Sequence, residues 1–165
     1  MRLFAAICLS PAVRDSLTER ISVLRSQGSG TFTRPENLHL TLAFIGETDR
    51  VEEAAAALHR AAVGGSFSLM VETLGCFDDL WWAGVRENTE LERLALGVQN
   101  ALRDAGFHIE KRPWRPHITL VRRWQGPHPQ VVLTPVSMQV REVSLMESER
   151  VDGMMIYTEL FRAEL

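Results

Sequence analysis

The chain has 165 residues, of which 45% are hydrophobic and 24% are charged. This length is typical of one globular domain with a sizeable core, and the composition excludes disordered and collagen-like proteins. The formal net charge is −3, from 18 basic and 21 acidic residues. That balance excludes proteins that hold nucleic acid through a broad positive surface, so any contact with phosphate must be local.

The apolar stretches are far shorter than the roughly 20 residues of a membrane span, so no membrane partner is expected. Leu3 to Leu9 is too short for a secretory core, and Ser10-Pro11 follows it in place of a cleavage site, so a cytoplasmic protein is expected. Cys8 and Cys76 lack metal-ligand spacing and are expected to be buried thiols. No obligate protein partner is evident.

The first half of the chain predicts strands that alternate with helices. Ser10 is expected to cap a helix that begins at Pro11 and ends within 26–30. An alanine-rich second helix is expected from about Arg50 to Val63, before Gly64-Gly65. Strands are expected at 3–9, 38–45 and 67–73.

The second half predicts a similar order of elements. Asn88 is expected to cap a helix that ends before Gly106. Strands are expected at 80–85, 117–122, 136–145 and 154–161.

An internal repeat relates the two halves. An offset of 78 residues places Leu3-Phe4-Ala5-Ala6-Ile7 on Trp81-Trp82-Ala83-Gly84-Val85, and His39 and Thr41 on His117 and Thr119. We therefore expect one α+β domain, 1–165, made of two strand-helix-strand units related by a pseudo-twofold axis. Its lobes are expected at about 1–77 and 78–165, with some strands exchanged, antiparallel sheets facing a central cleft and helices outside.

Two four-residue motifs stand at equivalent positions of this repeat: His39-Leu40-Thr41-Leu42 and His117-Ile118-Thr119-Leu120. Since strand side chains alternate, each histidine shares a face with its threonine, while Leu38, Leu40, Leu42 and Phe44 are expected to face the helices. Polar pairs on the inner face of an apolar strand need partners or a ligand. For the other histidines, His59, His108 and His128, a surface or packing role is expected.

Paired histidines can cleave a phosphodiester without a metal or a side-chain nucleophile. One imidazole takes a proton from the attacking oxygen and the other gives a proton to the leaving oxygen. The hydroxyls of Thr41 and Thr119 can donate hydrogen bonds to phosphate oxygens. A zinc site is the competing reading, but no Asp, Glu or Cys beside either motif completes a ligand set. We therefore expect no metal and no cofactor.

These motifs resemble those of the two-histidine phosphoesterases, and the chain is most similar to bacterial RNA 2',3'-cyclic phosphodiesterases, also called 2'-5' RNA ligases. The resemblance covers essentially the whole chain and is carried by four segments: Arg2 to Ile7, Asn37 to Gly46, Trp82 to Val85 and Pro116 to Arg122. It implies hydrolysis of a terminal 2',3'-cyclic phosphate to a 2'-phosphate. It also implies that His39 is the proton donor to the leaving 3'-oxygen and that His117 is the base that activates water. The sequence leaves open which histidine has which role.

The resemblance also assigns a phosphate contact to Arg122, although strict alternation from His117 would place Arg123 on the catalytic face instead. A bulge or a strand end after Leu120 would reconcile the two. Five basic residues lie between Lys111 and Arg123, which fits a site for a phosphorylated end, whereas a solvated basic loop is the alternative. Phe4 and Trp82, equivalent under the offset, are candidates for stacking on a terminal base, with core packing expected for at least one of them.

The expected partners are RNA ends that carry a 2',3'-cyclic phosphate, tRNA fragments included, or small cyclic nucleotides. The reverse reaction would join such an end to a 5'-hydroxyl through a 2'-5' bond. Two alternatives stay open. One is a noncatalytic module that binds a nucleotide or an RNA end, and the other is a phosphodiesterase for a cyclic nucleotide, an ADP-ribose cyclic phosphate or a 2'-5' oligoadenylate.

Overall fold

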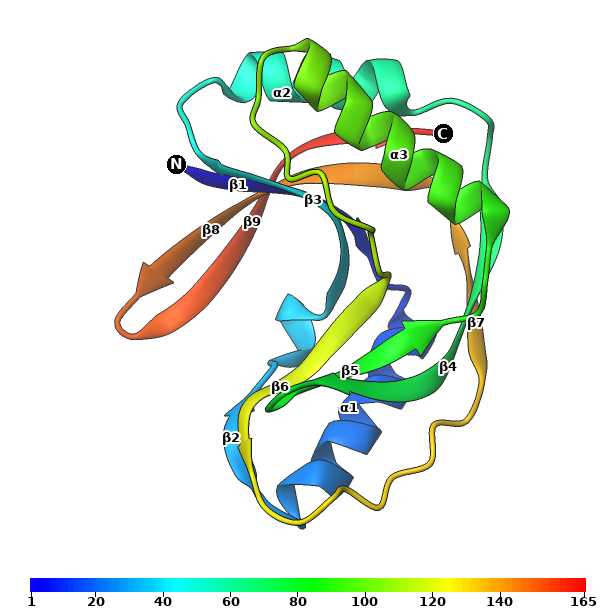
Figure 1. The fold of residues 1–165 in the computed structure, drawn as a ribbon, viewed down its shortest axis with the longest axis vertical. Coiled ribbons are helices and arrows are strands. Elements are labelled where there is room, and N and C mark those ends of the chain that lie inside the picture. The colour runs from blue at the N-terminus through cyan, green and yellow to red at the C-terminus, as the bar shows by residue number, and fades with distance from the viewer.

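A computed structural model describes all of residues 1–165, which form three α-helices, one short 3-10 helix and nine strands (Figure 1). The elements in chain order are β1 Arg2–Cys8, α1 Pro11–Arg25, β2 Ser29–Phe32, η1 Pro35–Asn37, β3 His39–Glu47, α2 Val51–Ala61, β4 Phe67–Phe77, β5 Leu80–Val85, α3 Thr89–Asp104, β6 His117–Gln125, β7 Val136–Val140, β8 Glu142–Val151 and β9 Met154–Glu164. None of the helices has the length and apolar character that a membrane span needs.

The strands form two antiparallel sheets. One has four strands in the order β3-β1-β8-β9, and the other has five in the order β2-β6-β5-β4-β7. Each sheet combines strands from both halves of the chain: β8 and β9 join the sheet of β1, while β2 and β4 join the sheet of β5. The lobes are therefore not the contiguous segments 1–77 and 78–165, and strands are exchanged between them.

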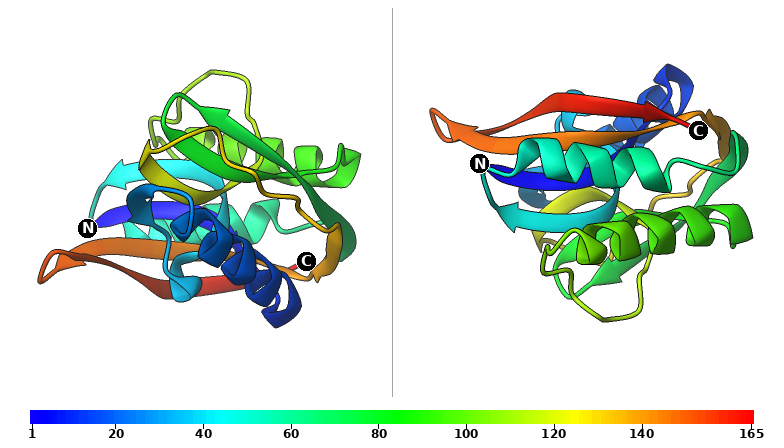
Figure 2. Two further views of the ribbon diagram at one scale, coloured as in Figure 1. Left: turned by 90° about the horizontal axis from the view of Figure 1, so that it is seen from below. Right: turned by 90° about the horizontal axis from the view of Figure 1, so that it is seen from above.

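The helices cover the outer faces of the sheets. Helix α1 packs on β2, β6 and β7 of the five-stranded sheet, although it follows β1 of the other sheet. Helix α2 packs on β8 and β9, and α3 lies beside α2 and against β3 (Figure 2). A core of buried apolar side chains lies beneath these helices, with Leu17, Leu58 and Leu102 contributed by α1, α2 and α3.

Helices α1 and α3, which follow the first strand of each repeat unit, begin where the sequence predicts. The Ser10 hydroxyl accepts a hydrogen bond of 3.3 Å from the backbone N–H of Val13, and the Asn88 side chain accepts one of 3.0 Å from Leu91. Ser10 and Asn88 are 78 residues apart, as are His39 and His117. The repeat in the sequence is therefore a repeat of helix starts as well as of motif strands.

Two expectations about the strands were wrong. The segment expected as one strand over 136–145 is split at Arg141 into β7 and β8, which belong to different sheets. The short strand β2 was missed because it lies in the stretch that was expected only to end the first helix. Gly28 and Gly30 fit there because an added Cβ would overlap Trp124 and the backbone of β6.

Candidate active site

The two motifs occupy matching places in the structure. Strand β3 begins at His39 and β6 begins at His117, and these two strands of different sheets contact one another (Figure 1). In both strands the His and Thr side chains are half-buried, while Leu40 and Ile118 between them are fully buried on the outer faces. We call the faces that carry the motif His and Thr side chains the inner faces. The sequence prediction for these four polar residues is confirmed as far as their placement is concerned.

His39 is held by hydrogen bonds on both ring nitrogens. Its Nδ1 lies 2.7 Å from the carbonyl oxygen of Asn37, which can only accept, so Nδ1 carries a hydrogen. Its Nε2 lies 2.8 Å from the hydroxyl of Thr41. Asn37 is buried, and its side-chain amide donates a 2.9 Å hydrogen bond to the carbonyl of Met155 in β9. These contacts hold the ring with Nε2 on the inner face, beside the Thr41 hydroxyl.

His117 is oriented in the same way. Its Nδ1 donates to the carbonyl of Arg115 at 2.8 Å, again two residues before the histidine. Its Nε2 is therefore directed to the inner face, as in His39. Both imidazoles direct Nε2 to the inner face because, in each motif, Nδ1 is bound to the backbone carbonyl two residues before the histidine.

Each histidine ring lies among aromatic side chains. The ring centroid of His39 is 4.9 Å from that of Phe4 and 5.1 Å from that of Tyr157. The ring of His117 is 5.2 Å from Phe77 and 6.3 Å from Trp82. These contacts fix the orientation of the rings, since aromatic faces and edges pack in preferred geometries.

The surroundings of His39 lower its pKa below the ordinary value. Burial is the largest cause, because it disfavours the charged imidazolium, while the hydrogen bond to the Asn37 carbonyl acts in the opposite direction. The positive charges of Arg122 and of His117 lower the pKa further. His39 therefore lies close enough to Arg122 and His117 of β6 to interact with their charges. Its lowered pKa keeps the imidazole neutral at lower pH than in a free histidine.

A β-bulge in β6 decides between Arg122 and Arg123. Trp82 of β5 pairs with Thr119 and Trp81 pairs with Val121, so Leu120 is an extra residue. Leu120 and Val121 are both buried on the outer face, which returns Arg122 to the inner face with His117 and Thr119. A bulge, one of the two irregularities that would place Arg122 on this face, is therefore present, and Arg123, with φ of 57°, lies beyond it.

Strand β3 has the same bulge. Ala5 pairs with Ala43 and Ala6 pairs with Thr41, so Leu42 is the extra residue. Phe44 therefore returns to the inner face, where it pairs with Phe4. The expectation that Phe44 faces the helices was wrong, because it assumed unbroken alternation along the strand.

Side chains from the second half of the chain hold the backbone of the first motif. The indole N–H of Trp114 donates to the Thr41 carbonyl at 3.1 Å, and the buried amide of Gln99 donates to the Leu42 carbonyl at 3.0 Å. In return, the hydroxyl of Thr33 donates to the Thr119 carbonyl at 2.8 Å. Each motif strand is thus fixed by residues that precede the other motif, which couples the positions of the two histidines.

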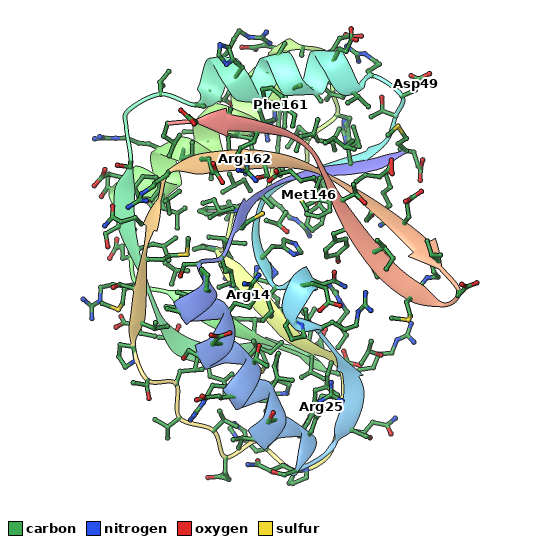
Figure 3. All side chains as sticks on the ribbon, turned by 180° about the vertical axis from the view of Figure 1, so that it is seen from behind. Arg14, Arg25, Asp49, Met146, Phe161 and Arg162 are labelled. Atoms are coloured by element: carbon green, nitrogen blue, oxygen red, sulfur yellow. The ribbon has the colours of Figure 1, made fainter.

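The stacking role expected for Phe4 does not fit its surroundings. Phe4 is 5% exposed and packs with His39, Tyr157 and Met146, the last of which is labelled in Figure 3. It therefore has no free face for a base. Trp82 is half-buried on the inner face, where a Cβ on Gly75 or Gly84 would overlap its ring, and its stacking role stays a prediction.

The equivalence of Phe4 and Trp82 also needs correction. Trp82 pairs with Thr119 of its motif strand, whereas the residue that pairs with Thr41 is Ala6. The first strands of the repeat are therefore displaced by two residues from the offset that relates the motifs. Matches between apolar residues did not reveal this displacement, since a shift of two keeps every side chain on the same face.

Other expectations were partly wrong. Cys8 and Cys76 are exposed, not buried. His59, His108 and His128 are exposed, as expected, and the ring of His128 packs on Trp81 at 5.2 Å. No group of three or more His, Cys, Asp and Glu side chains lies close enough together to hold a metal ion.

The basic side chains of the segment from Lys111 to Arg123 are exposed, and one of them forms an ion pair. Arg112 pairs with Glu110 at 2.8 Å. The other basic side chains of this segment form no ion pair within 4 Å. They are Lys111, Arg115, Arg122 and Arg123. The local positive charge expected beside the second motif is therefore present, with Arg112 largely neutralised.

Sequence reasoning missed several residues that shape the site. Tyr157 and Phe77 lie far from the motifs in the sequence, and nothing local marks them. Trp114 is close to His117, but its hydrogen bond to the other motif strand depends on how the lobes pack. Asn37 offered the clearest signal, because it is a polar residue that stands two positions before His39, just ahead of the motif strand.

Comparisons with known proteins place these features in a family. A family model described as the 2'-5' RNA ligase superfamily matches residues 13–152. An RNA 2',3'-cyclic phosphodiesterase from Thermotoga maritima is 31% identical, over 99% of this chain and 95% of that protein. One from Geobacillus stearothermophilus is 38% identical over 60% of this chain, a match that spans only 34% of that protein.

A solved structure agrees with the fold. The crystal structure of Escherichia coli LigT complexed with 3'-AMP has a TM-score of 0.78 and 30% sequence identity, covering 99% of this chain and 96% of that one. The family model and the relative that is 31% identical over nearly the whole chain lead to one conclusion. The chain belongs to the 2'-5' RNA ligase superfamily.

Proposed function

We propose that this protein hydrolyses the 2',3'-cyclic phosphate at an RNA end to a 2'-phosphate, with His39 and His117 as its acid and base. The observation that carries the proposal is the pair of equivalent imidazoles, each with Nδ1 bound to a backbone carbonyl two residues earlier. Two histidines that both direct Nε2 to the inner face, on strands that contact one another, can serve an attacking and a leaving oxygen at once. Relatives named RNA 2',3'-cyclic phosphodiesterase support this activity.

The proposed reaction is an in-line displacement at phosphorus. His117 Nε2 takes a proton from water, the water oxygen forms a new bond to phosphorus, and the bond from phosphorus to the 3'-oxygen breaks. Protonated His39 gives its Nε2 proton to that 3'-oxygen. The products are a 2'-phosphate and a 3'-hydroxyl, and no oxidant, cofactor or side-chain nucleophile takes part.

His39 must be charged to act as the donor, although its pKa is low in the free protein. Binding of an anionic phosphate between the motifs offsets the positive charge of Arg122, so it raises the pKa of His39. The substrate itself then promotes the protonation that its cleavage needs.

Three side chains are proposed to bind the nonbridging phosphate oxygens. The hydroxyls of Thr41 and Thr119 share the inner faces with the histidines, and the β6 bulge brings the Arg122 guanidinium to the same face. Arginine can bind two phosphate oxygens at once and stabilise charge that develops during displacement.

The proposed substrates are RNA ends, tRNA fragments included, or small cyclic nucleotides in the cytoplasm. The complex of E. coli LigT with 3'-AMP supports a nucleotide ligand for this fold. If a 5'-hydroxyl takes the place of the attacking water, the same displacement joins it to the cyclic phosphate through a 2'-5' bond, and the 3'-oxygen leaves as before.

Incubation of the protein with a short RNA that ends in a 2',3'-cyclic phosphate, in the presence of EDTA, tests the proposal. We expect conversion to a 2'-phosphate end, separated from the 3'-phosphate isomer by chromatography. A 3'-phosphate product, or no turnover, would reject it. If His39→Ala binds the RNA less tightly without any change in turnover, the noncatalytic binding module is correct instead.

A further inference from the structure

The backbone carbonyl that binds Nδ1 of His39 belongs to a single short turn. This turn, η1, has only three residues, and it is closed by backbone hydrogen bonds of 2.9 Å and 3.3 Å. Runs of 3-10 helix stay short because the geometry of their hydrogen bonds is poor. The direction of the Asn37 carbonyl, and with it the direction of the His39 ring, therefore depends on contacts from outside the turn.

Two side chains tie the turn to the hairpin formed by β8 and β9. The Asn37 amide donates to the Met155 carbonyl at 2.9 Å, and the Arg34 guanidinium donates to the same oxygen at 3.1 Å. A carbonyl oxygen has two lone pairs, so these two donors saturate it. Met155 pairs with Arg150 near the end of the hairpin, which projects away from α2 and α3 in Figure 1. Asn37 is 8% exposed, so its amide depends on this contact for a partner.

The same hairpin contacts the His39 ring directly. Tyr157 lies two residues beyond Met155 in β9. Its ring stands at 87° to the ring of His39, with the two centroids 5.1 Å apart. One element thus touches the imidazole and, through Asn37, also fixes the acceptor of the Nδ1 hydrogen.

The second motif lacks this arrangement. The offset of 78 residues places Asn37 on Arg115 and Arg34 on Arg112. Arg115 also supplies a backbone carbonyl to its histidine, but its side chain is exposed and binds no other element, while Arg112 pairs with Glu110 of its own loop. Only the first motif has its backbone acceptor anchored to a distant strand. The anchor therefore serves a need of the first histidine that the repeat alone does not explain.

We propose that Asn37 is a positioning residue for His39, through which the β8–β9 hairpin directs the proton donor at the leaving oxygen. The inference rests on the proposed function, in which His39 gives its Nε2 proton to the 3'-oxygen. Because the Asn37 carbonyl can only accept, Nδ1 keeps its hydrogen, and the proton that moves is the one on Nε2. Rotation of the ring would turn this N–H away from the leaving oxygen, and a misplacement of about 1 Å can cost about 100-fold in rate.

The kinetic test compares Asn37→Ala with Asn88→Ala on an RNA that ends in a 2',3'-cyclic phosphate. Asn88 is the matched control, because its amide also donates to a backbone carbonyl, that of Ser68, at 2.8 Å, and it caps α3 without contacting either motif. Both variants should unfold at a lower urea concentration than the wild-type protein. We expect only Asn37→Ala to lower kcat, by about 10- to 100-fold with KM within about 3-fold, because ring direction matters in the transition state and not for binding.

The spectroscopic test uses ¹⁵N–¹H NMR to show which imidazole nitrogen carries the hydrogen when the rings are neutral. In the wild-type protein we expect Nδ1–H for both His39 and His117. Asn37→Ala should shift His39 toward the tautomer with Nε2–H, because the hydrogen bond that selects Nδ1–H is lost. His117 should keep Nδ1–H in the same spectrum and serves as an internal control. If Asn37 only stabilised the fold, the tautomer of His39 would not change.

A kcat for Asn37→Ala within about 3-fold of that for Asn88→Ala, or a His39 hydrogen that stays on Nδ1, would overturn the inference. If Asn37→Ala does not fold, Arg34→Met replaces it, since it removes the other donor to the Met155 carbonyl. We expect this variant to lose about 3-fold in kcat and to show the same change of tautomer, and no change in either would overturn the inference. Failure of the wild-type protein to hydrolyse the RNA would instead reject the proposed function, and the NMR comparison would still decide whether Asn37 positions His39.

Discussion

The indole N–H of Trp114 donates a 3.1 Å hydrogen bond to the backbone carbonyl of Thr41. Trp114 lies in the segment before β6, whereas Thr41 lies in β3, which is an edge strand of the other sheet. The outward carbonyls of an edge strand have no partner strand, so side chains must satisfy them. This contact therefore both completes the hydrogen bonding of β3 and sets the distance between the two motifs.

Trp114→Phe should lower both stability and activity. It keeps most of the apolar ring but leaves the Thr41 carbonyl unsatisfied, at a cost of about 1 to 3 kcal/mol in the free energy of unfolding. Trp82→Phe is the matched control, because the indole N–H of Trp82 is buried without a hydrogen-bond partner. We expect it to leave stability unchanged or raised. Urea denaturation of both variants measures this, and equal losses would show that the hydrogen bond of Trp114 is unimportant.

Titration of His39 should give a pKa below the ordinary value near 6.5, since burial and the charges of Arg122 and His117 disfavour the imidazolium. Arg122→Gln removes one of these charges and should raise the pKa. NMR of the His39 ring proton as a function of pH measures both. If His39 is the acid, kcat/KM falls as pH rises through its pKa, and Arg122→Gln moves this fall to higher pH. An unshifted or raised pKa in the wild-type protein would contradict the account.

Arg122 and Arg123 should differ sharply in their effect on turnover. Arg122→Ala removes a guanidinium from the inner face and should lower kcat/KM about 100-fold, in the range for loss of one donor to a developing anion. Arg123→Ala removes an adjacent exposed arginine beyond the bulge and should change kcat/KM by less than about 3-fold. Steady-state kinetics with an RNA cyclic phosphate measures both. A larger loss of kcat/KM in Arg123→Ala than in Arg122→Ala would mean that Arg123, not Arg122, contacts the phosphate.

The sequence predicted local features well. The helix caps at Ser10 and Asn88 and the strand start at His117 depend on short-range chemistry, and the structure confirms them. The motif polar residues could also be assigned to one face, because two-residue alternation holds up to the bulges.

Features that depend on long-range packing could not be predicted. A bulge is one extra residue opposite a partner strand, so neither the face of Phe44 nor the division at Arg141 can be derived from alternation alone. The exchange of β4 and β8 between sheets likewise has no local signal. The hydrogen bonds of Trp114 and Gln99 depend on how α3 and the segment before β6 pack against β3, which is why the sequence offered no reason to place these residues in the site.

The central claim is that water attacks the cyclic phosphate while paired histidines move two protons. Turnover of an RNA 2',3'-cyclic phosphate in ¹⁸O-labelled water with EDTA, followed by mass spectrometry, tests it most directly. We predict one ¹⁸O atom in a 2'-phosphate product and a loss of about 10²- to 10⁴-fold in rate for His39→Ala and for His117→Ala, with folding retained. A 3'-phosphate product, or undiminished turnover by either variant, would contradict it.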